Sequence, residues 1–458
     1  MFSTRNFFSN KQKKKMKPYK IKNKRELFFD DFLTEDRSNL EIRLHEPHAH
    51  TPEPSLPDGY YMTMIQHDGT IRCYCRRNFS EFTKENPQYT VKSGFVGEYT
   101  AYNESAGGIK FLEPPLFLYD CGVPNVMYCM KIGTHNFCPF YDENPACPKE
   151  EKYKAIGGVC DQGGIFGFVS ADSYTFKLLS QKPLIEPKKE WEYCFDSQNV
   201  VFWSELENCY VCYFRLNKTP DGRKLRTIGK ITSPDFRVWG KPTYLNINLE
   251  NENLYVSLIA PYPRAKHLYI GTPTRYIEDR GSVTDITLVF SRDGIHFIRP
   301  FPGAWIKPGP DPERWKNRAN YLAYNIVQTK PEEMSLYHSH SHIRYSLRTD
   351  GFTSLTAAYS QGEWISKTMQ YENGWPEFNI ATSARGYFKV ELQTPDGKPF
   401  EGYSLAESKC FYGDKISYTA QWNNNNKKFP LKKNDLFRIR CILCEADLYS
   451  FSFQNPSK

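Results

Sequence analysis

The sequence predicts an all-β protein, with a five-bladed β-propeller followed by an antiparallel β-sandwich. Apolar residues alternate with period two in many short segments that end in turn residues, and helical periodicity is almost absent. A strand–turn–aromatic unit also recurs along the first three quarters of the chain. Aromatic residues make up 16% of the 458 residues, a composition that excludes a wholly disordered chain.

The internal repeat consists of an apolar strand, a Ser, a short turn near Asp or Gly, and an aromatic residue close to a Pro. Its four clearest copies are 99–114, 166–176, 228–242 and 287–300, and a looser fifth copy is 343–352. The aromatic residues are Phe111, Phe176, Trp239 and Phe297, with spacings of 65, 63 and 58 residues. A regular spacing of this kind is typical of repeat architectures.

Each copy is expected to contribute the outer strands of a four-stranded sheet. Asp293-Gly294 predicts a two-residue hairpin turn between two of these strands. Such a sheet buries both faces only when it packs against neighbours, and radial stacking of five sheets achieves this. The first strand of each unit would line the central channel. Its polar residues would then converge on one pocket at the channel mouth.

The distribution of charge and the extent of the repeat divide the chain into three predicted segments: a basic tail (1–25), the propeller (26–352) and the sandwich (353–458). Ten of the 60 basic residues and none of the 52 acidic residues lie in 1–25, so the rest of the chain is nearly neutral. A nearly neutral body argues against nucleic-acid binding. The tail is either a disordered arm, or a targeting signal or tether to an acidic surface. No further copy of the repeat occurs within 353–458.

The sequence shows no run of 18 apolar residues, and 1–25 contains no apolar secretion signal. The 13 Cys are an odd number and lie singly, which favours reduced thiols and a cytoplasmic or virion-associated protein. No cofactor is predicted. His338, His340 and His342 share one face of a predicted strand, which spreads them too far for all three to bind one ion. Two of them could bind a metal with a distant ligand, or all could lie on a solvent-facing edge.

Several segments, in order, resemble those of five-bladed propeller glycoside hydrolases, the clan of families 32 and 43. The resemblance is closest to a glycosyl-hydrolase-like branch with a C-terminal β-sandwich, and it covers nearly everything from residue 25 onward. The matching segments are RELFFDDFL (25–33), ESAGGIKF (104–111), HNFCPFYDENPACPKEEKYKAIGG (135–158), FDSQNVVFW (195–203), YIGTPTRY (269–276), TDITLVFSRDGIHF (284–297), RYSLRTDGF (344–352), NIATSARGYFKVELQTPDGKPFEGYSL (379–405) and EADLYSFSF (445–453).

This resemblance implies cleavage of glycosidic bonds by acids at the channel mouth, one as nucleophile or base, one as proton donor and one orienting the sugar. Asp142 looks like the clan's transition-state-stabilising Asp, although Glu143-Asn144 separate it from the Pro of that motif. Asp196, beside two amides, is suited to binding sugar hydroxyls, and Asp31 could supply the acid of the first blade. Each of these could instead have only a structural role. The clan's acid Glu motif is missing, and Glu98 is one possible substitute.

Candidate substrate-binding residues lie on or near the predicted inner strands. Arg275 could bind a sugar acid or a hydroxyl pair through its planar guanidinium. The other candidates are Asp285, which could instead only hold Arg275, and the polar residues His135, Asn199 and Asn320. Aromatic residues such as Trp203, Trp305, Trp315 and Tyr321 could stack on sugars or pack between blades. We therefore expect a protein that acts on an oligo- or polysaccharide, with a non-catalytic carbohydrate-binding or structural protein as the alternative.

Overall fold

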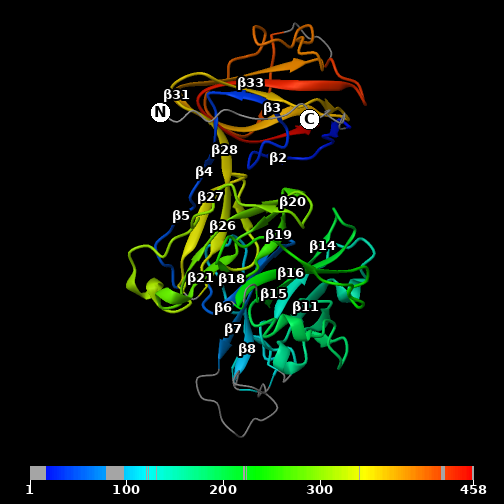
Figure 1. Ribbon diagram of the computed structural model, residues 1–458, viewed down its shortest axis with the longest axis vertical. Coiled ribbons are helices and arrows are strands. Elements are labelled where there is room, and N and C mark those ends of the chain that lie inside the picture. Colours follow the sequence, from blue (N-terminus) through cyan, green and yellow to red (C-terminus); the bar gives the residue numbers. More distant parts are fainter. Residues whose placement is uncertain are drawn as a thin grey trace. The chain divides into compact units, whose positions relative to one another are not determined.

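The computed structural model describes residues 17–78, 97–119, 121, 123–129, 132–219, 222, 224–339, 341–423 and 429–455. These residues form β-strands and short 3-10 helices and include no α-helix, which confirms the predicted all-β class (Figure 1). No helix among the described residues is long and apolar enough to cross a membrane. The chain divides into two compact units, Leu44–Phe352 and a second unit that combines Met1–Arg43 with Thr353–Lys458.

The first three sheets of the unit 44–352 are antiparallel meanders of four strands each (Figure 1). The first contains β6 (Tyr60–His67), β7 (Thr70–Asn78), β8 (Glu98–Ser105) and β9 (Val126–Tyr128), and the second contains β10 (Cys138–Tyr141), β11 (Tyr153–Gly157), β12 (Phe166–Ser170) and β13 (Lys177–Leu178). The third contains β14 (Val200–Ser204), β15 (Cys209–Lys218), β16 (Leu225–Ser233) and β17 (Thr243–Tyr244). The first strands of consecutive sheets contact each other, so they lie innermost.

The next segment of the chain forms two sheets instead of one. Their orders are β18-β21-β22 and β19-β20-β23-β24. The strands are β18 (Asn253–Val256), β19 (Ile259–Tyr262), β20 (Ala265–Gly271), β21 (Thr274–Ile277), β22 (Val283–Ile286), β23 (Val289–Ser291) and β24 (Phe297–Ile298). A few residues separate the strands of one sheet from those of the other. Leu258, between β18 and β19, is one of them and has a φ of +23°. Because this segment is divided, the number of five blades stays a prediction.

The last sheet of this unit is completed by a strand from the start of the unit. It contains β25 (Val327–Lys330), β26 (Glu333–Tyr337), β27 (Arg344–Arg348) and β5 (His48–Ala49). A parallel bridge between Thr63 and Tyr324 also joins the first sheet to the last. The Met64 N–H donates to the Tyr324 carbonyl at 2.9 Å across this bridge. These two connections join the beginning of the unit to its end, as the predicted radial arrangement requires.

The sequence repeat corresponds to one recurring turn and one recurring packing position. In three copies a Ser and an Asp two residues later are hydrogen-bonded, and the Asp carboxylate accepts backbone N–H groups of the turn: Ser170–Asp172, Ser233–Asp235 and Ser291–Asp293. The aromatic residue that follows packs edge-on against a ring of a neighbouring sheet. Examples are Phe176 with Tyr74 and Phe297 with Tyr213. The repeat therefore encodes contacts between sheets.

The prediction of a two-residue hairpin at Asp293-Gly294 is wrong. β23 ends at Ser291 and β24 begins at Phe297, so residues 292–296 form the connection. Gly294 has a φ of +71°, whereas Asp293 is not among the residues with positive φ. Both central residues of the expected turn need positive φ. The Asp293 side chain instead closes the wider turn by accepting the backbone N–H groups of Ile295 and His296, each within 2.9 Å.

The second unit is one ten-stranded sheet that surrounds its own apolar core. The N-terminal strands are β1 (Tyr19–Lys20), β2 (Glu26–Leu27), β3 (Thr34–Ser38) and β4 (Glu41–Leu44), and the C-terminal strands are β28 (Thr353–Ala357), β29 (Gly362–Ser366), β30 (Met369–Gln370), β31 (Trp375–Gln393), β32 (Asp414–Thr419) and β33 (Leu436–Gln454). The pairing of β1 with β30 is parallel, which departs from the predicted antiparallel sandwich. Trp364, Phe378 and Phe451 are fully or almost fully buried in the core.

The structure corrects the predicted boundaries at the N-terminal end. Residues 1–16 of the predicted tail lie outside the described residues, but Tyr19–Lys20 form a strand and Ile21 is fully buried. Arg25 is also buried, and its guanidinium is 2.8 Å from the Glu377 carboxylate. Residues 26–43 were assigned to the propeller, yet β2 pairs with β33 and β3 pairs with β29. Charge composition misled the prediction because basic side chains here pair with acids that are distant in sequence.

Arg25→Ala is expected to lower the free energy of unfolding of this unit by about 1–3 kcal/mol, because it leaves Glu377 and Ser450 without a buried donor. Thermal unfolding of the full chain measures the effect. Arg43→Ala is the matched control, since the exposed Arg43–Glu41 pair contributes about 0–1 kcal/mol. Equal melting temperatures for the two variants would mean that residues 17–25 do not stabilise the unit.

Candidate functional site

Polar and aromatic residues gather where the innermost strands of the unit 44–352 begin. Tyr61 and Tyr255 lie among the first residues of β6 and β18. His135 and Asp196 lie shortly before β10 and β14. Tyr321 precedes the segment that bridges to β6. Because the first strands contact one another, their starting ends meet at one end of the ring. We call this end the mouth.

A chain of three ionisable groups in contact, Glu98, His135 and Asp196, lies at the mouth. The His135 Nδ1 is 2.8 Å from Glu98 Oε2, and the His135 Nε2 is 3.5 Å from Asp196 Oδ1. The side chains of Glu98 and His135 are 5% and 1% exposed, whereas that of Asp196 is 24% exposed. Asp196 is therefore the member of the chain that solvent or a ligand can reach.

Two arginines complete this polar cluster. Arg76 Nη1 is 3.2 Å from Glu98 Oε1 and also donates to Asn136 Oδ1 at 3.1 Å. Arg215 Nη1 donates to the Asp196 carbonyl at 2.6 Å, and its Nη2 is 3.5 Å from Asp196 Oδ2. Each carboxylate of the chain thus has its own guanidinium, an arrangement that offsets the cost of burying charge.

The surroundings shift the pKa values of Asp196 and His135 in opposite directions. Burial alone would raise the pKa of Asp196, but the hydrogen bond from His135 and the charges of Arg215 and Arg76 lower it below its usual value. Burial would lower the pKa of His135, but hydrogen bonds to Asp196 and Glu98 raise it above 6.5. The same contacts therefore favour the anionic form of Asp196 and the protonated form of His135.

The loop that carries Asp196 is held by a network of backbone hydrogen bonds. Phe195 has a φ of +65°, a strained conformation for a bulky residue. Asn199 Nδ2 donates to the carbonyls of Phe195 and Ser197 at 3.0 and 3.1 Å, and its Oδ1 accepts the Arg215 N–H. Asn199 is 2% exposed and its amide orders the loop that carries Asp196, and its role as a substrate ligand stays a prediction.

Three tyrosines form an aromatic wall beside the polar cluster. The ring of Tyr321 lies 5.7 Å from that of Tyr61 and 5.9 Å from that of Tyr255, centroid to centroid. The guanidinium of Arg76 lies 4.6 Å from the centre of the Tyr61 ring, a cation–π distance. Tyr61 has a φ of +49°, so its backbone is in the left-handed region that bulky residues rarely adopt. Strain of this kind is concentrated at functional sites.

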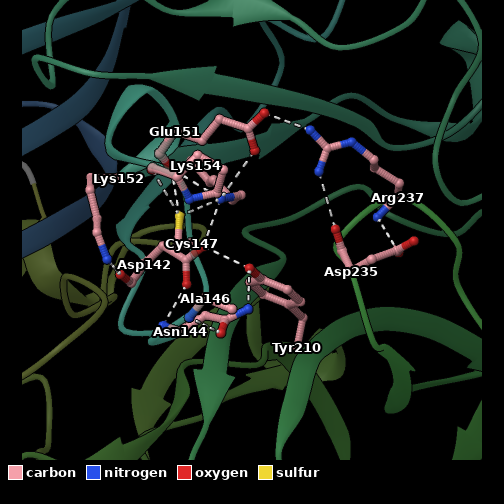
Figure 2. Close-up of polar contacts among 11 residues, drawn as sticks. Asp142, Asn144, Ala146, Cys147, Glu151, Lys152, Lys154, Tyr210, Asp235 and Arg237 are labelled. Atoms are coloured by element: carbon pink, nitrogen blue, oxygen red, sulfur yellow. Dashed lines mark hydrogen bonds and ion pairs between the residues drawn. The ribbon is translucent and has the colours of Figure 1, made fainter.

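The structure places Asp142 outside the mouth, in a buried ion pair, and its catalytic role stays a prediction. Its carboxylate is fully buried, 2.6 Å from Lys154 Nζ and 2.7 Å from the Tyr210 hydroxyl (Figure 2). It also accepts the Asn144 N–H at 2.9 Å. Figure 2 shows Lys154, Tyr210 and Asn144 all directed at this carboxylate. Asp142 follows the end of an innermost strand rather than its beginning, so it stabilises the loop after β10.

Three other predicted residues also lie elsewhere. Asp31 belongs to the second unit, where it pairs with Arg37 at 3.2 Å, so it cannot be the acid of a first blade. Arg275 and Asp285 form a two-point ion pair with each other at 2.7 and 2.6 Å, the alternative that the sequence left open. Both side chains remain partly exposed, so their role as substrate ligands stays a prediction.

Asn320 is fully buried and bonds to neighbouring backbone, and its role as a substrate ligand stays a prediction. Its Nδ2 donates to the carbonyls of Thr284 and Arg314 at 2.7 and 2.6 Å, and its Oδ1 accepts from Arg314 Nε. It thereby holds the chain just before Tyr321. Of the five predicted substrate ligands, His135 alone lies in the polar cluster.

The three histidines considered for metal binding do not form a metal site in the described part of the chain. His338 is buried, with its Nδ1 2.5 Å from the Ser341 hydroxyl. His342 Nδ1 is 2.9 Å from the Leu56 carbonyl, and His340 lies outside the described residues. No group of three or more potential metal ligands occurs among the residues that the structure describes.

A cavity of about 250 Å³ lies at the opposite ends of the innermost strands. Residues near the ends of β6, β10, β14 and β19 line it, including Gln66, Tyr141, Trp203 and Tyr262. Lys266 at its rim pairs with Glu143 at 2.8 Å and Glu205 at 3.0 Å. We call it the far cavity, because the strands separate it from the mouth. It is the structural alternative to the mouth as a ligand site.

The sequence predicted a polar pocket at the mouth, but several of the residues that form it were not singled out. Glu98 was considered only as a substitute for a missing acid, and Tyr321 only as one of several possible stacking residues. Arg76, Arg215 and Tyr255 were not singled out, since each lies inside an alternating strand segment that carries no motif. Only their position could have indicated a role in the site. They are charged or polar residues that lie close to the beginning of an inner strand, or opposite it on the next strand.

No protein-family model matches the chain, and no curated protein sequence matches it either. Among solved structures the chain is similar to one described as a glycoside hydrolase, at 13% identity and TM-score 0.45, covering 69% of this chain and 91% of that one. It is also similar to a β-1,2-mannobiose phosphorylase from Listeria innocua, at 10% identity and TM-score 0.45, covering 64% and 89%. A third is an endo-arabinase from Bacteroides thetaiotaomicron, at 12% identity and TM-score 0.40, covering 67% and 96%.

Proposed function

We propose that this protein binds a glycan at the mouth of the unit 44–352. One observation carries the proposal: Asp196 is a partly exposed carboxylate with a lowered pKa, beside a wall of tyrosine rings. Ionised carboxylates accept hydrogen bonds from sugar hydroxyls, and such charge-assisted bonds are the stronger kind. Aromatic rings can cover the apolar C–H faces of a sugar. Arg215 and His135 hold the carboxylate in place, so little ordering is needed when the ligand binds.

The geometry of the polar cluster disfavours the two-carboxylate cleavage expected from the sequence. Glycosidases place two carboxyl groups on either side of the scissile bond, with the sugar between them. Here the imidazole of His135 lies between Glu98 and Asp196 and contacts both. Glu98 is 5% exposed and paired with Arg76, so it cannot reach a sugar in this arrangement. Asp196 is thus the single accessible acid of the described cluster.

Cleavage of a glycosidic bond by a different arrangement is the second candidate. The lowered pKa of Asp196 favours it, because an ionised carboxylate can act as a base or nucleophile at neutral pH. This function requires a proton donor on the other side of the ligand. Release of reducing ends from a bound polysaccharide, abolished by Asp196→Asn, would support cleavage. Binding without any release would support the binding function alone.

Asp196→Asn is expected to weaken glycan binding by about tenfold to a hundredfold, because a hydrogen bond to a charged group contributes about 1.5–3 kcal/mol. A glycan array followed by calorimetry on the best ligand measures the change. Asp31→Asn is the matched control, since it removes an exposed acid of the other unit and should leave affinity unchanged. Trp203→Ala tests the far cavity. Loss of binding in Trp203→Ala together with unchanged binding in Asp196→Asn would move the ligand to the far cavity and refute the proposal.

A further inference from the structure

Arg318 is an exposed cation at the mouth that has no acidic partner among the described residues. Its Nη1 donates to the Tyr255 hydroxyl at 3.2 Å and its Nε to Asn317 Oδ1 at 3.1 Å. The backbone adopts a φ of +53°, and its N–H donates to the Ser282 carbonyl at 2.9 Å. The strained backbone and the Tyr255 bond hold the guanidinium beside the tyrosine wall, although no carboxylate attracts it there.

Several buried donors around Arg318 also have no hydrogen-bond partner within the described structure. They are the Tyr321 hydroxyl and the Nε atoms of Arg215 and Arg226. The Arg226 guanidinium stacks on Tyr276 at 4.5 Å and lies 5.9 Å from the ring of Tyr255, so it belongs to the same wall. Leaving a buried donor unpaired costs about 1–3 kcal/mol. A ligand rich in acceptor oxygens would remove this cost.

The charges of the mouth do not balance. Arg76 is paired with Glu98, Arg215 with Asp196, and Arg226 with Glu278 at 3.5 Å. These pairs leave the guanidinium of Arg318, which is held by the Tyr255 hydroxyl, without an acidic partner among the described residues. An anionic group is therefore the ligand feature that this surface lacks. Planar guanidinium groups match carboxylates through two parallel hydrogen bonds.

We infer that the glycan bound at the mouth is acidic, with the carboxylate of a uronic-acid residue on Arg318 and its neighbouring oxygens accepting from the Tyr321 hydroxyl. This inference rests on the proposed function and specifies its ligand class. The same anion chemistry is offered by sulfated sugars, whose tetrahedral group can also contact a guanidinium. Neutral glycans would leave the Arg318 charge and the Tyr321 hydroxyl without partners.

Calorimetry with three matched oligosaccharides tests the ligand class: an oligogalacturonide, its carboxyl-reduced neutral counterpart and a sulfated galactan fragment of equal length. We expect the oligogalacturonide to bind about tenfold or more tightly than the neutral sugar, with affinity falling as salt rises. Tighter binding of the sulfated fragment would overturn the carboxylate assignment. Equal affinity for neutral and acidic sugars would overturn the inference while leaving the proposed function intact, and no binding of any glycan would overturn both.

Two variants assign the contacts. Arg318→Gln should lose the preference for the acidic sugar and keep its affinity for the neutral one, whereas Arg237→Gln, at an exposed arginine paired with Glu151, should change neither. Tyr321→Phe should weaken binding of the acidic sugar about fivefold to tenfold without lowering the melting temperature, because the hydroxyl has no partner to lose. Unchanged affinity in both mouth variants, with unchanged melting temperatures, would refute this assignment.

Discussion

Lys154→Met lowers the free energy of unfolding by about 3–5 kcal/mol, the largest effect that we expect of any single substitution at a charged residue. Lys154 Nζ is 1% exposed and contacts Asp142 Oδ2 at 2.6 Å, the Cys147 sulfur at 3.0 Å and the Glu151 carbonyl at 3.0 Å (Figure 2). Removing the ammonium leaves the Asp142 carboxylate buried with only neutral donors. Denaturant unfolding followed by tryptophan fluorescence measures the loss.

Two further variants make this result specific to the ion pair. Lys152→Met removes a neighbouring ammonium that donates to the Asp142 carbonyl at 3.4 Å and lies 5.9 Å from the centre of the Tyr141 ring, and it should cost less than about 1 kcal/mol. The double variant Asp142→Asn with Lys154→Met should recover part of the loss, because no unpaired charge remains. If Lys154→Met unfolds at the same denaturant concentration as Lys152→Met, Asp142 does not have the structural role described above.

Glu98→Gln is expected to cost about 3 kcal/mol of stability near pH 6, because it breaks a buried pair with His135 and weakens one with Arg76. It should also lower the pKa of His135, since one of the two acceptors that raise it loses its charge. A His with a raised pKa in the folded state stabilises fully below pH 6.5 and loses that contribution as pH rises through the raised value. In Glu98→Gln this decline should begin at lower pH.

Unfolding free energies between about pH 5 and 9, for wild type and variant, test the prediction. Glu46→Gln is the control, because Glu46 forms an exposed pair with Lys307 at 3.4 Å and should change neither stability nor its pH dependence. NMR titration of the His135 ring would follow the pKa directly. Parallel stability profiles for Glu98→Gln and wild type would show that Glu98 does not hold the imidazole proton.

The periodicity of the sequence was sufficient to predict the class of fold and the repeating unit. Alternating residues predicted strands such as β6 and β15, and the spacing of Phe176 and Phe297 predicted units that pack against one another. Both signals are local, because side-chain alternation and turn chemistry depend on residues that are close in sequence. The same local signals could not show that β2 and β3 would pair with strands near the C-terminus.

Local context also did not show which of the predicted acids would be buried. Asp142 lies in a segment that resembles a functional motif, yet Lys154 and Tyr210 bury its carboxylate. Asp196 and His135 were both proposed from the inner strands, and the structure brings them together with Glu98. The sequence distances within this cluster are long, so no motif could join its members before the sheets were assembled.

By itself the sequence determined an all-β chain with repeating units, polar beginnings of the inner strands and a distinct C-terminal segment after residue 352. Only the tertiary structure decided which carboxylate is accessible, which cation has no acid beside it, and which basic residues belong to a packed core. The physical reason is that strand formation and turns depend on neighbouring residues, whereas burial, ion pairing and pKa depend on side chains brought together from different sheets.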